Sequence, residues 1–219
     1  MIKAILFDID GTLIDSNGLH VDAWAQVFAD AGHDVPPEAI APQIGKGGDH
    51  LVPALLPDLD EDAQERLAEA HGTLFKAQYI ARALPFPGAA ALLRRAHEDG
   101  MRVVLASSAR AEELDHYVEL LDIADIVAAK TSSDDVQSTK PAPDIFAVAL
   151  KKAGVSAEEA VAVGDTPYDV ASAAGAGVAT IALLSGGFAE DALRGEGAAA
   201  VYADVAAVLA DYASSPLAG

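Results

Sequence analysis

Cysteine is absent from the 219-residue chain, which excludes a disulfide framework, a zinc site built on thiolates and a cysteine nucleophile. Long apolar runs are also absent: no stretch of roughly 18 consecutive apolar residues occurs, so we expect no membrane-spanning helix. Basic residues are few, since 14 Lys and Arg face 34 Asp and Glu and give a formal net charge of −20. That charge repels polyanions, so we expect neither nucleic acid nor a membrane surface as a partner. A phosphate-bearing ligand must then be held by a local cluster of donors and metal ions.

What the chain does contain is enough apolar material for a packed core, with 52% hydrophobic and 22% charged residues. At roughly 100–200 residues per domain, its length allows one large domain or one domain with a sizeable insertion. The apolar start, residues 1–7, is too short for a signal peptide, and Asp8 follows it at once. We therefore expect a cytoplasmic α/β protein, either a monomer or a homodimer.

Short apolar segments alternate with amphipathic segments along most of the chain. Continuous apolar runs of this length are typical of strands buried on both faces of a parallel sheet. Two of the intervening segments carry helix start signals, with Pro143 before Asp144 and Ser156 three residues before Glu159. The alternation predicts a doubly wound, Rossmann-like parallel sheet flanked by helices. We expect strands at residues 2–7, 102–106, 126–128, 160–163, 178–183 and 198–202, and helices at residues 89–99, 111–121, 144–153, 168–174 and 205–212.

Residues 17–83 break this alternation, because they contain no convincing strand. In the longest helical pattern apolar residues recur every three or four positions, which marks one buried helix face. The sequence therefore predicts an α/β core domain made of residues 1–16 and 84–219, and an inserted all-helical cap domain of residues 17–83. Within the insertion we expect helices at residues 19–31, 37–44, 49–56 and 60–83, separated by glycines and prolines.

Two carboxylates, Asp8 and Asp10, come directly after the first expected strand. Ligands of open α/β sheets bind at the carboxyl ends of the strands. Gly11 permits a tight turn close to a ligand, and the hydroxyl of Thr12 can hold that turn. A plain turn stabilised by the aspartates is an equally common origin of such a stretch. A calcium loop is not, because His20 and its neighbours stand where such a loop needs its last glutamate.

A second acidic pair follows another apolar strand in the stretch 164–169. Asp165 lies at the expected strand end, and Asp169 lies one helical turn later, so both can face the same crevice. Asp165 could merely cap the following helix, which would leave the other carboxylates unexplained. Several carboxylates at one place repel each other unless a cation neutralises them. A hard divalent ion, Mg²⁺, fits this all-oxygen ligand set.

Two further elements can donate hydrogen bonds or positive charge. Ser107 and Ser108 end the strand at 102–106, and Lys140 precedes a proline-rich stretch. Hydroxyl groups and backbone N–H groups at a strand end, together with an ammonium group, can cradle a phosphate. Alone, a serine after a strand is usually a turn residue and a lysine is usually solvated. Their occurrence at successive sheet ends favours the phosphate site.

The stretches Asp8-Ile9-Asp10-Gly11-Thr12-Leu13, Val103-Val104-Leu105-Ala106-Ser107, Lys140-Pro141 and Gly164-Asp165 through Asp169 resemble the four motifs of the haloacid dehalogenase superfamily of phosphohydrolases. The resemblance covers nearly the whole chain, including a helical cap after the first motif. Within the superfamily the chain is similar to the subgroup that holds phosphoglycolate phosphatase and β-phosphoglucomutase.

The resemblance implies a role for each motif residue. Asp8 is the nucleophile that forms an aspartyl-phosphate, and Asp10 is the general acid and base. Thr12, Ser107, Ser108 and Lys140 bind the phosphoryl group. Mg²⁺ lies on the Asp8 carboxylate, the Asp10 carbonyl oxygen and Asp165, with Asp169 in or near its ligand shell. General acid catalysis at Asp10 requires neighbours that hold its proton near neutral pH.

The substrate is expected to be a small phosphorylated metabolite that the sequence does not name. The alternative to a phosphatase is a phosphotransferase, or a sugar phosphomutase of the β-phosphoglucomutase type. That alternative is disfavoured because the cap loop at residues 45–50 has no arginine for a second phosphate. His20 and Lys46 are candidate substrate contacts from the cap. A hinge-packing histidine and a solvated lysine are the plainer interpretations of the two.

Overall fold

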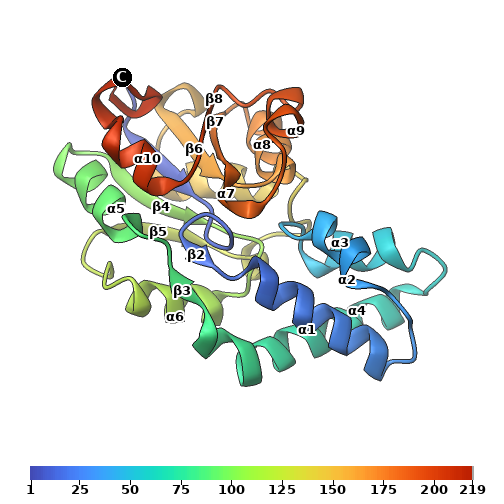
Figure 1. Ribbon diagram of the computed structural model, residues 1–219. Helices are drawn as coiled ribbons and strands as arrows, with labels where there is room; N and C mark the ends of the chain where they lie inside the picture. Colours follow the sequence, from blue (N-terminus) through green and yellow to red (C-terminus); the bar gives the residue numbers. More distant parts are fainter. Residues whose placement is uncertain (219) are drawn as a thin grey trace.

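The computed structural model describes residues 1–218 and has a six-stranded parallel sheet at its centre. The strand order is β5-β4-β1-β6-β7-β8, so the first strand lies in the middle with later strands on both sides, as in a doubly wound sheet (Figure 1). The strands are β1 (Ala4–Phe7), β4 (Arg102–Ala106), β5 (Val127–Thr131), β6 (Ala160–Gly164), β7 (Ala179–Leu183) and β8 (Ala200–Tyr202).

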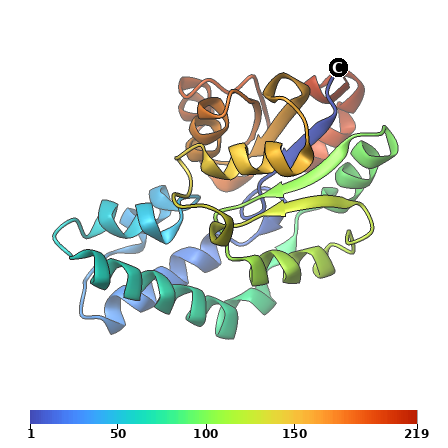
Figure 2. The ribbon, with the colours of Figure 1, turned by 180° about the vertical axis from the view of Figure 1, so that it is seen from behind.

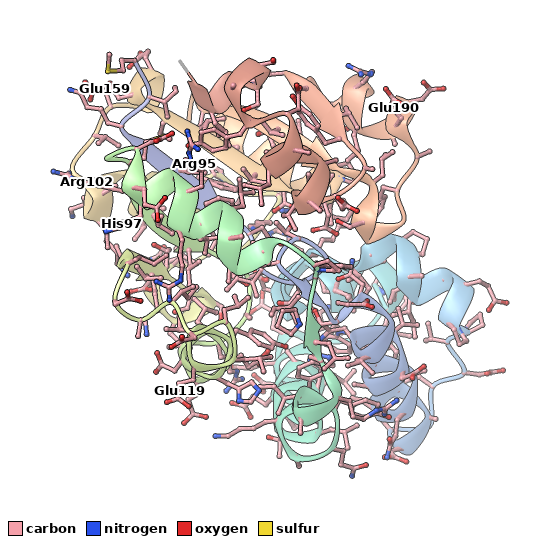
Figure 3. All side chains as sticks on the ribbon, turned by 60° about the vertical axis from the view of Figure 1, so that its left-hand side comes forward. Arg95, His97, Arg102, Glu119, Glu159 and Glu190 are labelled. Atoms are coloured by element: carbon pink, nitrogen blue, oxygen red, sulfur yellow. The ribbon has the colours of Figure 1, made fainter. Side chains whose placement is uncertain are left out.

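Helices cover both faces of the sheet, which explains why its strands are apolar without alternation. Ile5 and Phe7 of β1 pack in one core cluster with α5, α6 and α10, whereas Ala4 and Leu6 pack on the other face with α7 and α8. Charged side chains such as Arg95 lie on the outer surface (Figure 3). The helices are α5 (Ala89–Glu98), α6 (Ala111–Leu120), α7 (Asp144–Ala153), α8 (Pro167–Gly175), α9 (Glu190–Gly195) and α10 (Val205–Ala210). Within residues 1–218 no helix combines the length and apolarity that a bilayer crossing demands.

Between the short strands β2 (Ile14–Asp15) and β3 (Leu84–Pro85) the described chain is helical. We call this segment the helical insert; it lies beyond one end of the sheet (Figures 1 and 2). It has a hydrophobic cluster of its own, which includes Trp24, Phe28 and Leu51. Its elements are α1 (Asn17–Asp30), α2 (Pro37–Ile40), a 3₁₀ turn (Ala41–Gln43), α3 (Gly48–Leu55), α4 (Glu61–Leu74), a π-helical turn (Phe75–Tyr79) and a 3₁₀ turn (Ile80–Arg82).

The two connections between the insert and the sheet region run side by side. Ile14 pairs with Pro85 and Asp15 with Leu84 in an antiparallel ribbon. Each connection is therefore hydrogen-bonded to the other. The ribbon begins only a few residues after Asp10.

Some elements of the structure differ from those expected. The single helix expected at residues 60–83 is α4 followed by π and 3₁₀ turns, and the π turn carries Phe75, whose ring stacks on His20 at 3.8 Å between centroids. The strand expected at 126–128 runs on to Thr131, because β5 is an edge strand and an edge tolerates polar residues such as Lys130. Helix α9 was not expected; its Leu193 packs against Val170 and Ala182.

Candidate active site

The candidate site lies at the carboxyl ends of β4, β1 and β6, which are neighbours in the sheet. Asp8 follows β1, Ser107 follows β4 and Asp165 follows β6. Parallel pairing of Phe7 with both Leu105 and Val163 brings these strand ends to one edge. The sequence pattern thus placed the motif residues correctly, and the fold explains why residues so distant in the chain meet.

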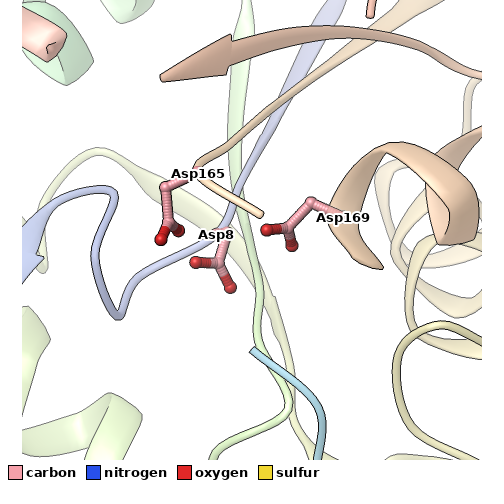
Figure 4. Close-up of side chains that lie close together, drawn as sticks. All are labelled: Asp8, Asp165 and Asp169. Carbon is pink, nitrogen blue, oxygen red and sulfur yellow. The ribbon is translucent and has the colours of Figure 1, made fainter. Parts of the chain in front are cut away.

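Three buried carboxylates form the centre of the site. Asp8, Asp165 and Asp169 each offer an oxygen atom within 4.8 Å of those of the others, and their side chains point toward one another (Figure 4). Asp169 reaches the group from the first turn of α8. All are nearly inaccessible, at 6%, 0% and 1% exposure respectively. Their oxygen atoms are the donors that Mg²⁺ prefers.

The pKa values of two of these groups indicate excess negative charge. Burial, followed by the nearby Asp169 and Asp10 charges, raises the pKa of Asp8 to about 7 even though Lys140 lowers it. Burial, together with the charges of Asp169 and Asp8, raises the pKa of Asp165 well above its ordinary value. A divalent cation among the three would relieve both effects, so the residues present fit a Mg²⁺ ion.

Lys140 is the one cation that the described chain places inside this group of carboxylates. Its Nζ lies 2.5 Å from Asp8 Oδ1 and 2.6 Å from Asp169 Oδ1, and the residue is 1% exposed. Burial opposes its charge, but the carboxylates of Asp169 and Asp8 outweigh burial and raise the pKa of Lys140. Lys140 is therefore a permanent positive charge at the floor of the site.

Fixed hydrogen bonds hold two of the carboxylates. Thr12 Oγ1 donates to Asp165 Oδ1 at 2.8 Å, and Asn17 Nδ2 donates to Asp165 Oδ2 at 3.0 Å. Asp169 Oδ2 accepts from the Thr166 backbone N–H at 3.0 Å and from its hydroxyl at 2.7 Å, in a capping box that begins α8.

Thr12 was predicted to bind phosphate, but its hydroxyl hydrogen is engaged by Asp165. This contact favours a role in positioning Asp165. Glycine is required beside the same carboxylate, because a Cβ on Gly11 would lie 2.2 Å from Asp165 Oδ2 and a Cβ on Gly186 only 1.9 Å from it.

Asp10 lies beside the carboxylate group but has different partners. Ser16 Oγ donates to Asp10 Oδ1 at 2.6 Å, and His20 Nε2 lies 3.2 Å from the same oxygen. Burial favours the neutral acid, but the charge and hydrogen bond of His20 outweigh it and lower the pKa of Asp10. The surroundings of the substrate-free site therefore favour ionised Asp10, contrary to the retained proton that general acid catalysis requires.

His20 is the group beside Asp10 that can hold this proton. Burial lowers the pKa of His20, but the Asp10 charge and hydrogen bond prevail and raise it. His20 Nδ1 also lies 3.4 Å from His71 Nε2. His20 thus stacks on Phe75 and also lies within hydrogen-bond distance of Asp10, where the two groups can exchange a proton.

The two serines after β4 differ in their partners. Ser107 Oγ accepts a hydrogen bond from the Ala109 backbone N–H at 3.0 Å, which shapes the loop. Ser108 Oγ is buried and has no hydrogen-bond partner among the described residues. An unpartnered buried hydroxyl beside Asp8 is an observation that favours a ligand at this place.

A cavity of about 280 Å³ opens above these groups. Asp8, Asp10, Ser107 and Ser108 line it on the sheet side, and residues of the helical insert such as Trp24 and His71 line the other side. Lys46 lines it from the insert, donates to Gln43 Oε1 at 2.6 Å and lies 4.7 Å from the centroid of the Tyr168 ring. Both cap residues named from the sequence, His20 and Lys46, therefore line the cavity.

Among the cavity residues that sequence reasoning missed are three ionisable ones: His71, Glu113 and Arg110. His71 stacks on Trp24 at 4.1 Å, and burial lowers its pKa well below the ordinary value. Glu113 and Arg110 stand at the start of α6, where a charged residue is ordinarily a helix-terminal feature. Only their proximity to Asp10 in the fold distinguishes them.

The helical insert also touches the core beside Lys140. The Thr139 backbone N–H donates to Asp49 Oδ2 at 2.9 Å, and the Thr139 hydroxyl donates to Asp49 Oδ1. The Gly47 backbone N–H donates to Thr139 Oγ1 at 3.0 Å, and His50 Nε2 lies 2.8 Å from Ser138 Oγ. We refer to these contacts as the 47–50/138–139 contact.

Comparisons with known proteins agree with the motifs. The family model of haloacid dehalogenase-like hydrolases matches residues 2–177. A phosphoglycolate phosphatase from Rhodospirillum rubrum is 31% identical over 230 residues, which cover 100% of this chain and 94% of that protein.

Solved structures give the same result. A hydrolase from Pseudomonas syringae superposes with a TM-score of 0.90 at 27% identity, covering 97% of this chain and 98% of that one. A mutant of CbbY from Rhodobacter sphaeroides, in complex with xylulose-1,5-bisphosphate, superposes with a TM-score of 0.76 at 27% identity, covering 94% and 96% of the two chains. The α/β fold expected from the sequence is confirmed.

Proposed function

The chain belongs to the family of haloacid dehalogenase-like hydrolases and is a phosphatase of that family, and we propose that it hydrolyses a small phosphate monoester through an aspartyl-phosphate on Asp8, with Mg²⁺ as cofactor. The observation that carries this proposal is the position of Asp8 at the floor of the cavity, 2.5 Å from Lys140 and beside two further buried carboxylates. A carboxylate held in this way can attack phosphorus once the charge of the incoming phosphate is offset.

In the first step an oxygen of Asp8 attacks phosphorus while the ester oxygen leaves. Lys140 faces the equatorial oxygens, on which charge spreads in the transition state. Ser107 and Ser108 line the cavity together with Asp8, and in this proposal their hydroxyl groups donate to the same phosphoryl group. These donors are positioned before substrate arrives, which is the condition for large electrostatic stabilisation.

Asp8, Asp165 and Asp169, with the carbonyl oxygen of Asp10, are the ligands that we assign to the metal. Bound there, Mg²⁺ would supply positive charge that offsets the repulsion between the Asp8 carboxylate and the phosphate dianion. Thr12 and Asn17 keep Asp165 in place for this purpose.

The leaving oxygen needs a proton, and the Asp10–His20 pair holds one. The dianionic substrate adds negative charge next to Asp10, which favours transfer of the shared proton from His20 Nε2 to Asp10 and on to the ester oxygen. In the second step Asp10 takes a proton from the water that attacks the aspartyl-phosphate.

The helical insert acts as a cap over this chemistry in our proposal, with residues 17–83 as the cap domain and residues 1–16 and 84–219 as the core. It closes the cavity opposite Asp8, so that bulk water is excluded while the substrate reacts. The ribbon of β2 and β3 provides the two hinge strands.

A phosphomutase is the second candidate, and one observation favours it. Arg110 lines the cavity from the core side and could hold a second phosphate, although the loop at residues 45–50 has no arginine. Feeding β-glucose 1-phosphate with Mg²⁺ and a trace of the 1,6-bisphosphate decides between the two. Glucose 6-phosphate formed faster than free phosphate would overturn the phosphatase proposal.

Substitution of the nucleophile tests the mechanism. Asp8→Asn should lower phosphate release from natural esters by at least about 10³-fold, because the amide is not a comparable nucleophile. The matched control is Asp115→Asn, which removes an exposed carboxylate from α6 and should leave the rate unchanged. Circular dichroism checks that both variants fold, and near-normal turnover by Asp8→Asn contradicts the covalent mechanism.

A further inference from the structure

Glu113 is a buried carboxyl group for which the mechanism above has no use. It lies in the first turn of α6, is 6% exposed, and lines the cavity together with Asp10, His20 and His71. No hydrogen bond from another group of residues 1–218 affects its protonation, and its oxygens are not among the fully enclosed unpartnered atoms, so the carboxyl group opens into the cavity. A carboxyl group on a largely buried residue ordinarily has a protein partner, and this one has only the cavity to face.

Helix capping does not explain this residue. Acidic side chains stabilise a helix N-terminus, and Glu112 meets that need at 73% side-chain exposure, where it pairs with Lys76. Glu113 makes no capping hydrogen bond, although it stands at the position from which a glutamate could do so. The side chain is turned into the cavity instead.

The surroundings of Glu113 change its pKa. Burial raises the pKa of Glu113 to about 7, although the charges of His20 and Arg110 act in the opposite direction. No protein donor offsets the effect of burial on this carboxyl group. A ligand that brings a hydrogen-bond donor to this place would supply what is missing.

The position of Glu113 identifies the part of the substrate that it faces. Asp10 is assigned to the ester oxygen, so the alcohol moiety lies on the Asp10 side of the cavity, where Glu113 and His71 form the wall. Building on the proposed phosphatase function, we propose that Glu113 accepts a hydrogen bond from a second hydroxyl group of the alcohol, and thereby selects phosphate esters of polyhydroxy alcohols over esters that carry a carboxylate.

A phosphate ester that carries a carboxylate close to its ester oxygen is the least suitable substrate for this side of the cavity. In 2-phosphoglycolate the carboxylate is one carbon from the ester oxygen, so it must lie close to Asp10 and Glu113. Asp10 has a lowered pKa and is ionised, and Glu113 is ionised above its pKa of about 7, so above that pH like charges repel in this low-dielectric cavity. The cations of the cavity have other neighbours: His20 is paired with Asp10, Lys46 donates to Gln43, and the exposed Arg110 lies near Gly72 of the insert. The chain should therefore differ in preference from its phosphoglycolate phosphatase relative.

The test compares three esters in wild type, Glu113→Ala, Glu113→Gln and the control Glu112→Gln. The esters are glycerol 3-phosphate, 2-phosphoglycolate and p-nitrophenyl phosphate, with phosphate release as the readout. Wild type should prefer glycerol 3-phosphate to 2-phosphoglycolate by about tenfold or more in kcat/KM. Glu113→Ala should lower kcat/KM for glycerol 3-phosphate by about tenfold, mainly through KM, and change p-nitrophenyl phosphate by less than about twofold.

The conservative variant separates hydrogen bonding from folding. Glu113→Gln keeps an acceptor oxygen and removes the charge, so it should retain most glycerol 3-phosphate activity and raise kcat/KM for 2-phosphoglycolate by about fivefold. Glu112→Gln should match wild type with all three esters. Equal wild-type preference for the two natural esters, or equal losses on all three esters in Glu113→Ala, would overturn the inference. If wild type releases phosphate from none of the esters, the proposed function itself fails, which is distinguishable because p-nitrophenyl phosphate makes no demand on Glu113.

Discussion

The buried carboxylates should make the stability of the metal-free protein fall as pH rises. Burial raises the pKa of Asp8 from 3.8 to about 7 and that of Asp165 well above 3.8. Between the unfolded and folded pKa values the folded chain binds more protons than the unfolded chain, so the free energy of unfolding falls with increasing pH. The stabilisation is complete below about pH 4 and is lost as pH rises through the folded pKa.

Other groups act in the same direction within this window. Burial raises the pKa of Glu113 from 4.5 to about 7. The pKa of His20 is raised because its partner Asp10 outweighs burial, so the stability that His20 contributes is also lost as pH rises above 6.5. Asp10 acts oppositely, since its lowered pKa contributes stability that is lost only as pH falls below about 4.

The size of the effect follows from the shift of Asp8. From about pH 5 to its folded pKa near 7 the difference is about two units, and each unit corresponds to about 1.4 kcal/mol, so Asp8 alone contributes on the order of 3 kcal/mol. For a domain of this size, 1 kcal/mol shifts the melting temperature by about 2–4 °C. We therefore expect the melting temperature in EDTA to fall by about 6–12 °C between pH 5 and pH 8.

The assay is thermal unfolding by circular dichroism in EDTA, repeated with Mg²⁺. Mg²⁺ should raise the melting temperature more at pH 8 than at pH 5, because protonated carboxylates bind the ion less well. Asp165→Asn should flatten the pH dependence in EDTA and reduce the response to Mg²⁺, whereas Asp115→Asn, at an exposed position, should change neither. A melting temperature in EDTA that does not vary with pH, or an equal Mg²⁺ response at both pH values, would refute the reasoning.

Two further variants test the surroundings of the site. His20→Gln keeps a hydrogen bond to Asp10 but cannot carry the proton. The value of kcat should therefore fall by about 10²-fold for alkyl phosphates, and by less for p-nitrophenyl phosphate, whose leaving group needs no proton. Equal losses on both esters would contradict the shared proton. Thr139→Val removes the hydroxyl that joins Asp49 and Gly47, which should cost about 1–3 kcal/mol of cap closure and raise KM by about fivefold or more. The control Thr73→Val, on an exposed face of α4, should leave KM unchanged. Equal KM values in the two variants would rule out a role of the contact.

The sequence predicted the sheet and the meeting of its motif residues for a simple physical reason. Apolar runs that end in Asp8, Ser107 and Asp165 are strands buried on both faces, and parallel strands end at one edge of the sheet. The helical nature of residues 17–83 was visible in the same way, from the spacing of apolar residues. The prediction from the local sequence pattern agrees with the structure wherever the position of a residue depends only on its own strand or helix.

The sequence could not predict which residues of different segments contact one another in the site. Thr12 was assigned to phosphate, but its hydroxyl meets Asp165, which lies 153 positions away in the chain. Asp10 was assigned a retained proton, but His20 on α1 lowers its pKa. Glu113 was indistinguishable from an ordinary acidic residue at a helix start. In each case the decisive neighbour comes from another element, and no local pattern reports it.

The 47–50/138–139 contact links the movement of the cap to the chemistry of the core. Asp49 and Gly47 of the helical insert hold both the backbone N–H and the hydroxyl of Thr139, and Lys140 is the next residue. We expect that opening of the insert would break these hydrogen bonds and free the backbone next to Lys140. Closure of the insert would then restore them, so that the position of Lys140 would depend on the insert as well as on its ion pairs with Asp8 and Asp169. A phosphatase benefits from this order of events, because the nucleophile is then activated only in the closed cavity.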